Sequence, residues 1–312
     1  MSKFIPIRVA NLRGDLKIAF DIFVLVAGKH IHYCRKGESF EGTRLERLKT
    51  KKLKKMYIPE GDEPAYQDYL NASIDEAYAN TDKPIEVRAE VIQGFQQAAA
   101  EQYMEDPSDK YSYEYTKTSV MRFTQFLQKE PAALRALLGL KNTDFSVTHH
   151  GVSVATLSVG IAMEAKINVT DPLHLLALGC LIHDIDHFYT ELPLDQPVES
   201  WDPEKQAKYK DHPLNGAHRL QTADFVDQLV HKIIIQHEEH IDGSGFPQKL
   251  LEKDLHPLAL VAGVANAFDR MISYDQMNPK DALKAMLVDK MGMYPLPLLQ
   301  TLQDILKRQK IV

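Results

Sequence analysis

Cysteine is scarce in this chain of 312 residues, which contains only Cys34 and Cys180. Two cysteines so far apart cannot form a disulfide framework, so a reducing compartment is the default. No apolar run reaches the ~18 residues that a membrane-spanning helix needs. The first residues, MSKFIPIRVANLRGD, carry charges where a secretory signal peptide has its apolar core. We therefore expect a cytoplasmic protein without a membrane span.

Positive charge is also in short supply, because the formal net charge is −6. This argues against a partner that is a nucleic-acid polymer, whose binding depends on neutralising phosphates. Apolar residues make up 44% of the chain and charged residues 26%, a balance typical of globular rather than disordered proteins. The length allows two domains of ordinary size.

Strand signals are confined to the first ~60 residues, where short β-branched or aromatic runs such as FIPIRV and FDIFVLV alternate with glycines. From Glu63 onward, apolar residues recur at three- and four-residue spacing, which indicates helices. We predict a mainly α protein. A small α/β domain with linker helices would occupy residues 1–140, and a helical domain would occupy residues 141–312.

Histidine is plentiful and unevenly placed: two of the thirteen lie before residue 140, and eleven lie between residues 149 and 256. A single histidine on a helix is usually an ordinary core or surface residue. Here ligand-capable groups recur every ~25–35 residues, each in its own helical segment, as metal sites of helical bundles require. The segment DHPLNGAHRLQ is expected to place His212 at the beginning of a helix. The candidate ligands are His150, His183, Asp184, His212, His237, Glu238, and Asn266 or Asp269.

The stretch LIHDIDHF places four ionisable groups within an apolar run. Burying such groups is costly unless they pair or coordinate a metal. Imidazole and carboxylate ligands without a thiolate favour iron or manganese, with zinc and nickel as alternatives.

These residues resemble a known family. The order H…HD…H…H…D, with IHDI at its centre, resembles the signature of the HD phosphohydrolase superfamily. The run HEEHIDGSGFP is similar to the HHExxDGxGYP motif of the HD-GYP subfamily, phosphodiesterases of the second messenger cyclic di-GMP. The resemblance covers roughly residues 145–275. It implies an HD-type helical bundle preceded by a small accessory domain.

The resemblance implies a centre of two divalent metal ions. Ser146 stands where family members with a third metal have a glutamate, so two ions are expected. Asp184 would bridge them. One ion would take His150, His183, Asp184 and Asn266 (or Asp269), and the other would take Asp184, His212, His237 and Glu238.

The resemblance also assigns catalytic and substrate-binding roles. His187 replaces a lysine that helps to bind substrate phosphate, Phe246 replaces the tyrosine of GYP, and Asp275 stands where an arginine is expected. The glycines of DGSGFP suit positive φ angles or close approach to a ligand. The catalytic candidates are Asp184, His187 and Glu239, and the substrate-binding candidates are His187, Asp242, Gly243, Gly245 and Phe246.

The expected function is hydrolysis of a cyclic dinucleotide by metal-activated water in cyclic di-GMP signalling. Two alternatives stay open. The departures at His187, Phe246, Asn266 and the missing arginine would suit a catalytically degenerate receptor or adaptor that binds metal and nucleotide. An HD phosphohydrolase acting on another nucleotide is the second. No cyclase domain is recognisable, so a diguanylate cyclase domain that acts as a signalling partner would belong to another chain.

The spacing of the histidines argues against a zinc protease, because the motif H-E-x-x-H needs histidines four residues apart. His237 and His240 are three residues apart.

Overall fold

The computed structural model describes residues 3–14, 16–40, 44–51, 53, 55–142, 145–165, 167 and 172–312. The chain divides into two compact units, Met1–Ala98 and Ala99–Val312. This division differs from the predicted boundary at residue 140, because the helices of residues 110–138 pack on helices of the second unit.

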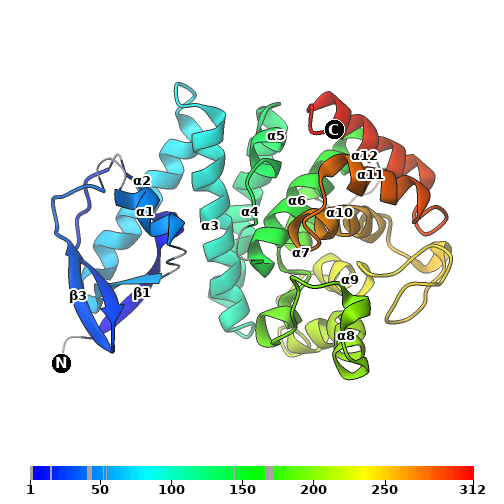
Figure 1. Cartoon of the computed structure of the whole chain (residues 1–312), viewed down its shortest axis with the longest axis horizontal. Helices are drawn as coiled ribbons and strands as arrows, with labels where there is room; N and C mark the ends of the chain where they lie inside the picture. Colours follow the sequence, from blue (N-terminus) through cyan, green and yellow to red (C-terminus); the bar gives the residue numbers. More distant parts are fainter. Residues whose placement is uncertain are drawn as a thin grey trace. The chain divides into compact units, whose positions relative to one another are not determined.

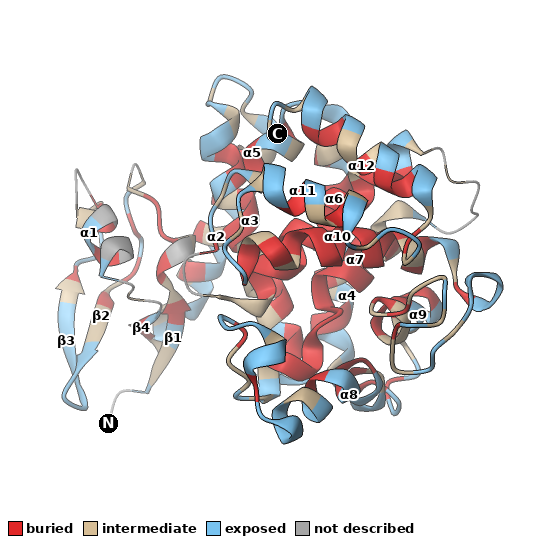
Figure 2. Ribbon diagram, turned by 45° about the vertical axis from the view of Figure 1, so that its right-hand side comes forward, coloured by how far each residue is buried: buried red, intermediate tan, exposed pale blue. Residues whose placement is uncertain are grey.

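The first unit is built on a four-stranded antiparallel sheet (Figure 1) with the strand order β1-β4-β2-β3, and Figure 2 labels all four strands. Its sheet and helices bury one apolar cluster, in which Ile22 and Met56 of the sheet lie with Tyr66 and Tyr69 of α2. This unit is the small α/β domain that the strand signals predict. Its elements are β1 Phe4–Arg8, β2 Ile22–Val26, β3 Lys29–Cys34, α1 Arg44–Thr50, β4 Lys55–Pro59 and α2 Glu63–Ala79.

The second unit is helical, which confirms the predicted mainly α fold. Helix α3 continues into it from the first unit. The helices are α3 Ile85–Glu105, α4 Lys110–Lys129, α5 Ala133–Leu138, α6 Val147–Glu164, α7 Leu173–Ile182, α8 Pro203–Arg219, α9 Gln228–Gln236, α10 Pro257–Ser273, α11 Pro279–Val288 and α12 Leu296–Arg308. None of the helices in the described ranges is long and apolar enough to cross a membrane.

Helices α6, α7 and α10 form the core of this unit and are buried along most of their length (Figure 2). Glycines set the spacing between neighbours. A Cβ on Gly151 of α6 would lie 2.3 Å from the carbonyl oxygen of Leu181 in α7, and one on Gly179 of α7 would lie 2.6 Å from Cδ1 of Ile233 in α9. The close approach brings the first turn of α6 next to the last turn of α7.

Candidate metal centre

Four histidines and one aspartate converge from four helices. His150 lies in the first turn of α6, and His212 lies within α8. His183 and Asp184 directly follow α7, and His237 directly follows α9. All five side chains are buried. The structure therefore brings together five of the candidate ligands named from the sequence.

Asp184 lies at the centre of the cluster. Its Oδ1 is 3.3 Å from Nε2 of His212, 3.4 Å from Nε2 of His183 and 3.5 Å from Nε2 of His237. Its Oδ2 is 3.8 Å from Nε2 of His150. Ligands bound to one cation at ~2.1 Å lie ~3 Å apart, so these separations suit ligands around shared metal ions. Burial alone would raise the pKa of Asp184, but the surrounding imidazoles hold it well below its usual range.

Backbone carbonyls orient three of the imidazoles. The Nδ1 atom of each ring lies within hydrogen-bond distance of the carbonyl three residues earlier: 2.7 Å for His183, 2.5 Å for His212 and 2.8 Å for His237. Because a carbonyl only accepts, Nδ1 carries the proton and Nε2 turns a lone pair toward Asp184. Such contacts hold metal-ligating histidines in the correct tautomer.

The prediction that His212 lies at the beginning of a helix is wrong. His212 lies in the interior of α8. Asp202 caps the helix by accepting a hydrogen bond from the Lys205 amide (2.9 Å), and Pro203 occupies the first turn. Pro213 is inside the helix. It has no N–H to donate to the Tyr209 carbonyl, which contacts His212 instead. Pro213 therefore leaves the Tyr209 carbonyl available to orient the His212 ring, and it does not start a helix.

The donor set fits divalent metal ions. Nε2 of His212 and Nε2 of His237 are 2.9 Å apart, and in this tautomer neither carries a proton. Nε2 of His183 is buried without a hydrogen-bond partner among the described residues. Lone pairs so arranged repel unless a cation lies among them. Among the described residues, three groups could hold an ion: His150, His183 and Asp184; Asp184, His187 and His212; and His212, His237 and Glu238.

Asn266 and Asp269, the two candidates for the last ligand, lie on opposite sides of the His150 ring. Oδ1 of Asn266 is 2.9 Å from Nε2, on the side of Asp184, whereas Oδ2 of Asp269 is 2.7 Å from Nδ1. Asp269 also accepts a hydrogen bond from the Ser273 hydroxyl (2.8 Å). Burial lowers the pKa of His150, but the contact with Asp269 outweighs it and raises the pKa. Asn266 thus lies on the side of the His150 ring that faces Asp184, and Asp269 lies on the opposite side.

His187 lies beside these ligands as a neutral ring. It is buried, it stacks on Tyr209 with ring centroids 5.5 Å apart, and its centroid is 4.2 Å from that of His212. Neither ring nitrogen has a hydrogen-bond partner in the described part of the chain. Burial, and next the nearby His212, hold its pKa well below the usual range. His187 therefore offers a nitrogen lone pair to the cluster, not a positive charge.

A cavity of about 290 Å³ reaches the centre at Glu238 and Asn266. Its wall includes Tyr209, Phe246 and Arg270. The Tyr209 hydroxyl donates to Glu238 (2.8 Å) and accepts from the Arg270 guanidinium (2.9 Å). Sequence reasoning missed Tyr209 and Arg270. The only signals are their positions, three residues before His212 and directly after Asp269.

The remaining predicted residues build the loop that follows α9. Glu239 is buried and accepts hydrogen bonds from the backbone amides of residues 248–250, at 2.6, 3.1 and 2.9 Å. Asp242 is exposed and accepts from Ser244. Gly243 has a φ angle of 77°. These side chains lie in the loop and not among the candidate ligands.

The loop also fixes Phe246. A Cβ on Gly245 would lie 2.4 Å from the backbone nitrogen of His240 and 2.5 Å from the carbonyl oxygen of Glu238, so only glycine fits there. The Phe246 amide donates to that same Glu238 carbonyl (3.1 Å). The Phe246 ring packs edge-on against Tyr209, with the centroids 5.7 Å apart. Phe246 lines the cavity. Among the described residues, the other predicted loop residues, Glu239, Asp242, Gly243 and Gly245, do not.

Comparison with known proteins identifies related chains. Residues 191–292 match the family model of the HD domain. The solved structure of Bd1817, a HDG"Y"P protein from Bdellovibrio bacteriovorus, is 44% identical. The match covers 98% of this chain and 100% of that chain, with a TM-score of 0.89.

Two curated relatives match over shorter stretches. Cyclic di-GMP phosphodiesterase PA4108 from Pseudomonas aeruginosa is 33% identical over 147 residues, which are 46% of this chain and 35% of that protein. Cyclic di-GMP phosphodiesterase PdeB from Borreliella burgdorferi is 21% identical over 123 residues, which are 39% of this chain and 32% of that protein. The chain spans about a third of the length of these two relatives.

Proposed function

Because this chain belongs to the HD-GYP family of HD-domain proteins, we propose that it is a metal-dependent phosphodiesterase that hydrolyses a cyclic dinucleotide, with cyclic di-GMP as the first candidate. The observation that carries the proposal is the convergence of four imidazole Nε2 atoms on the Asp184 carboxylate, where a cavity reaches Glu238 and Asn266. A site that is open on one side of a metal cluster suits metal-assisted hydrolysis.

Asp184 is the residue that two ions would share, because its two oxygens face different histidines. His150, His183 and Asn266 would complete one set of ligands, with Asp269 behind His150. His212, His237 and Glu238 would complete the other set.

When bound by these residues, two divalent ions would supply an activated water and the positive charge that offsets the charge of a phosphodiester. Nitrogen and oxygen donors without thiolate suit iron or manganese, with zinc and nickel as alternatives.

The protein's own contribution is to orient ligands and shape the cavity. The carbonyls bonded to Nδ1 hold three imidazoles with Nε2 toward Asp184. The Phe246 ring presents an apolar surface in the cavity wall, which suits stacking against a nucleobase. A diguanylate cyclase domain on another chain, which would supply the substrate, is the expected signalling partner.

A receptor that binds the dinucleotide without cleaving it is the second candidate. Three observations favour it: His187 is a neutral buried ring, Phe246 lacks a hydroxyl, and Asp275 contributes a carboxyl group to the cavity wall.

The test is to reconstitute the purified protein with Fe(II) or Mn(II) under reducing conditions. Bound metal is then measured, and cyclic di-GMP hydrolysis is followed by chromatography. We expect about two ions per chain and conversion to a linear dinucleotide or GMP, both lost in Asp184→Asn. Two ions and tight binding without turnover would support the receptor. A protein that binds neither metal nor dinucleotide would refute both candidates.

A further inference from the structure

The proposed substrate is an anion, yet two expected cationic groups are missing from the site. His187 stands in place of a lysine, and its ring is buried and neutral. Asp275 stands in place of an arginine and brings a carboxyl group to the cavity. A positively charged donor close to the metal ligands would strengthen the binding of a phosphodiester, because hydrogen bonds between charged groups are the stronger ones.

Arg270 is placed to supply it. It follows Asp269 on α10 and lines the same cavity as Glu238 and Asn266. Its guanidinium donates to the Tyr209 hydroxyl at 2.9 Å, and that hydroxyl donates to Glu238 at 2.8 Å. Two hydrogen bonds therefore separate Arg270 from a candidate metal ligand.

The guanidinium is charged and held in a defined orientation. Burial lowers its pKa, but the neighbouring Tyr209, Glu238 and Asp275 outweigh this and raise it. The guanidinium carbon lies 4.7 Å from the ring centroid of Tyr209 and 5.7 Å from that of Tyr274. Contact with two rings and one hydroxyl fixes the plane of the group before a ligand arrives.

Most of its hydrogen-bonding capacity is unused. A guanidinium has five N–H donors, and the Tyr209 hydroxyl is its one hydrogen-bond acceptor within the described residues. None of its nitrogens is buried without a partner. The remaining donors are therefore accessible from the cavity, whose wall contains two further cations, Lys210 and Lys290.

We propose that Arg270 is the phosphate-binding residue of this site and replaces the missing lysine and arginine from a different position on the fold. The ligand class is a phosphodiester or phosphate monoester. It would accept hydrogen bonds from the N–H groups of Arg270 that do not contact Tyr209, in the cavity that Glu238 also lines. Tyr209 is the positioning residue, because it contacts both Arg270 and Glu238. This inference rests on the proposed function for the identity of the dinucleotide, but not for the binding of phosphate.

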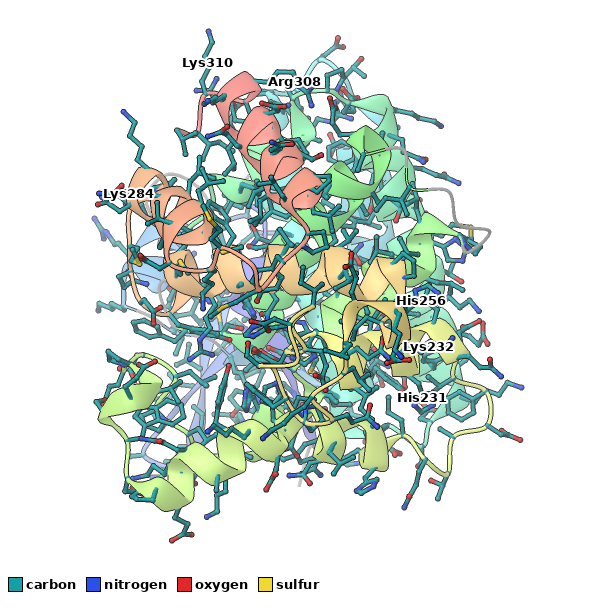
Figure 3. The ribbon with its side chains drawn as sticks, turned by 90° about the vertical axis from the view of Figure 1, so that its right-hand side faces the viewer. His231, Lys232, His256, Lys284, Arg308 and Lys310 are labelled. Carbon is teal, nitrogen blue, oxygen red and sulfur yellow. The ribbon has the colours of Figure 1, made fainter. Side chains whose placement is uncertain are left out.

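The test compares Arg270→Gln with Arg308→Gln in the metal-loaded protein. Arg308→Gln removes the same charge, but Arg308 is the last residue of α12 (Figure 3). It forms an exposed ion pair with Glu164. Binding of cyclic di-GMP and, separately, of inorganic phosphate is measured by titration calorimetry. Metal content and thermal stability are recorded for each protein.

We expect Arg270→Gln to weaken binding of both ligands by about 10- to 100-fold, the effect of one charged hydrogen-bonded contact, with metal content unchanged. Arg308→Gln should bind like the wild type. Arg270→Lys keeps the positive charge but loses the paired N–H donors of the guanidinium. Its affinity for both ligands should therefore lie between that of the wild type and that of Arg270→Gln. If Arg270→Gln does not fold, Arg270→Met, which keeps an unbranched apolar stem but removes the charge, decides the matter, and wild-type affinity in that variant would overturn the inference.

The outcomes separate this inference from the proposed function. If the wild type binds cyclic di-GMP and Arg270→Gln binds it equally well, Arg270 has no such role and the proposed function stands. If the wild type binds phosphate through Arg270 but does not bind cyclic di-GMP, the inference stands and the dinucleotide is wrong. If the wild type binds neither ligand, both are overturned.

Discussion

Replacing Gly151 by alanine should damage the metal centre without changing any ligand. The new Cβ would lie 2.3 Å from the Leu181 carbonyl oxygen, 3.0 Å from its carbonyl carbon and 3.3 Å from its Cα. Because these are backbone atoms of α7, the side chain cannot rotate away. Ordinary contact begins near 3.4 Å, so α6 and α7 must separate by about 1 Å.

Separating α6 from α7 would displace the candidate ligands next to the contact. His150 directly precedes Gly151, and His183 follows Leu181 by two residues. Metal–ligand distances tolerate only about ±0.2 Å. Overpacking costs about 1–3 kcal/mol, and the better helix propensity of alanine returns about 1 kcal/mol. We expect a net loss of about 1 kcal/mol in the free energy of unfolding and a fall of at least about tenfold in metal affinity.

Gly160→Ala is the matched control, because it makes the same change in the same helix. Its Cβ would lie 2.5 Å from Cδ1 of Leu134, a side-chain methyl group that can move, and 3.8 Å from the next atom. Urea denaturation of the metal-free proteins and competition with a chelator measure the two quantities. If Gly151→Ala matches Gly160→Ala in stability and in metal affinity, the close approach of α6 to α7 does not position the ligands.

Three further predictions concern single side chains. Glu239→Gln replaces a charged acceptor of three backbone amides. Urea denaturation should therefore show a free energy of unfolding lower by about 1.5–3 kcal/mol, with metal content unchanged. Loss of metal at unchanged stability would instead make Glu239 a ligand. Asp269→Asn weakens the orientation of His150, so metal affinity should fall by about 10- to 100-fold in chelator competition, and wild-type affinity would contradict this role. In the metal-free protein, burial and His212 lower the pKa of His187, so its contribution to stability is complete above the unfolded value near ~6.5 and is lost as the pH falls below it. Between about pH 6.5 and pH 5 the wild type should therefore lose up to about 1.4 kcal/mol per pH unit more than His187→Leu, and parallel curves in urea denaturation would refute the neutral buried ring.

The helical fold could be predicted because apolar residues recur at helix spacing from Glu63 to the end of the chain. The position of His212 could not, because Pro213 has a different role than its local context indicates. A proline often starts a helix, and the alternative depends on the Tyr209 carbonyl and its contact with the His212 ring, which only the folded helix shows.

The candidate ligands could be predicted because metal binding requires particular residue types, and histidine and aspartate at recurring intervals are visible in a sequence. Tyr209 and Arg270 carry no comparable signal. Both are common residues, and their place in the site depends on α8 and α10 presenting them to one cavity. Many other residues lie equally close to the predicted ligands in the sequence, so nothing in the sequence distinguishes Tyr209 and Arg270 from them.

The adjacent residues Glu238 and Glu239 show where sequence reasoning reaches its limit. Both are glutamates directly after the candidate ligand His237, and the resemblance implies that Glu238 is a ligand and Glu239 is catalytic. Helix α9 has ended at this point, so successive side chains leave the backbone in different directions. Glu238 contacts Tyr209 and Asn266 in the cavity, whereas Glu239 holds the amides of residues 248–250. The two adjacent carboxylates of the motif therefore meet different partners. One lies in the cavity, and the other accepts from three backbone amides and holds the loop that carries Phe246.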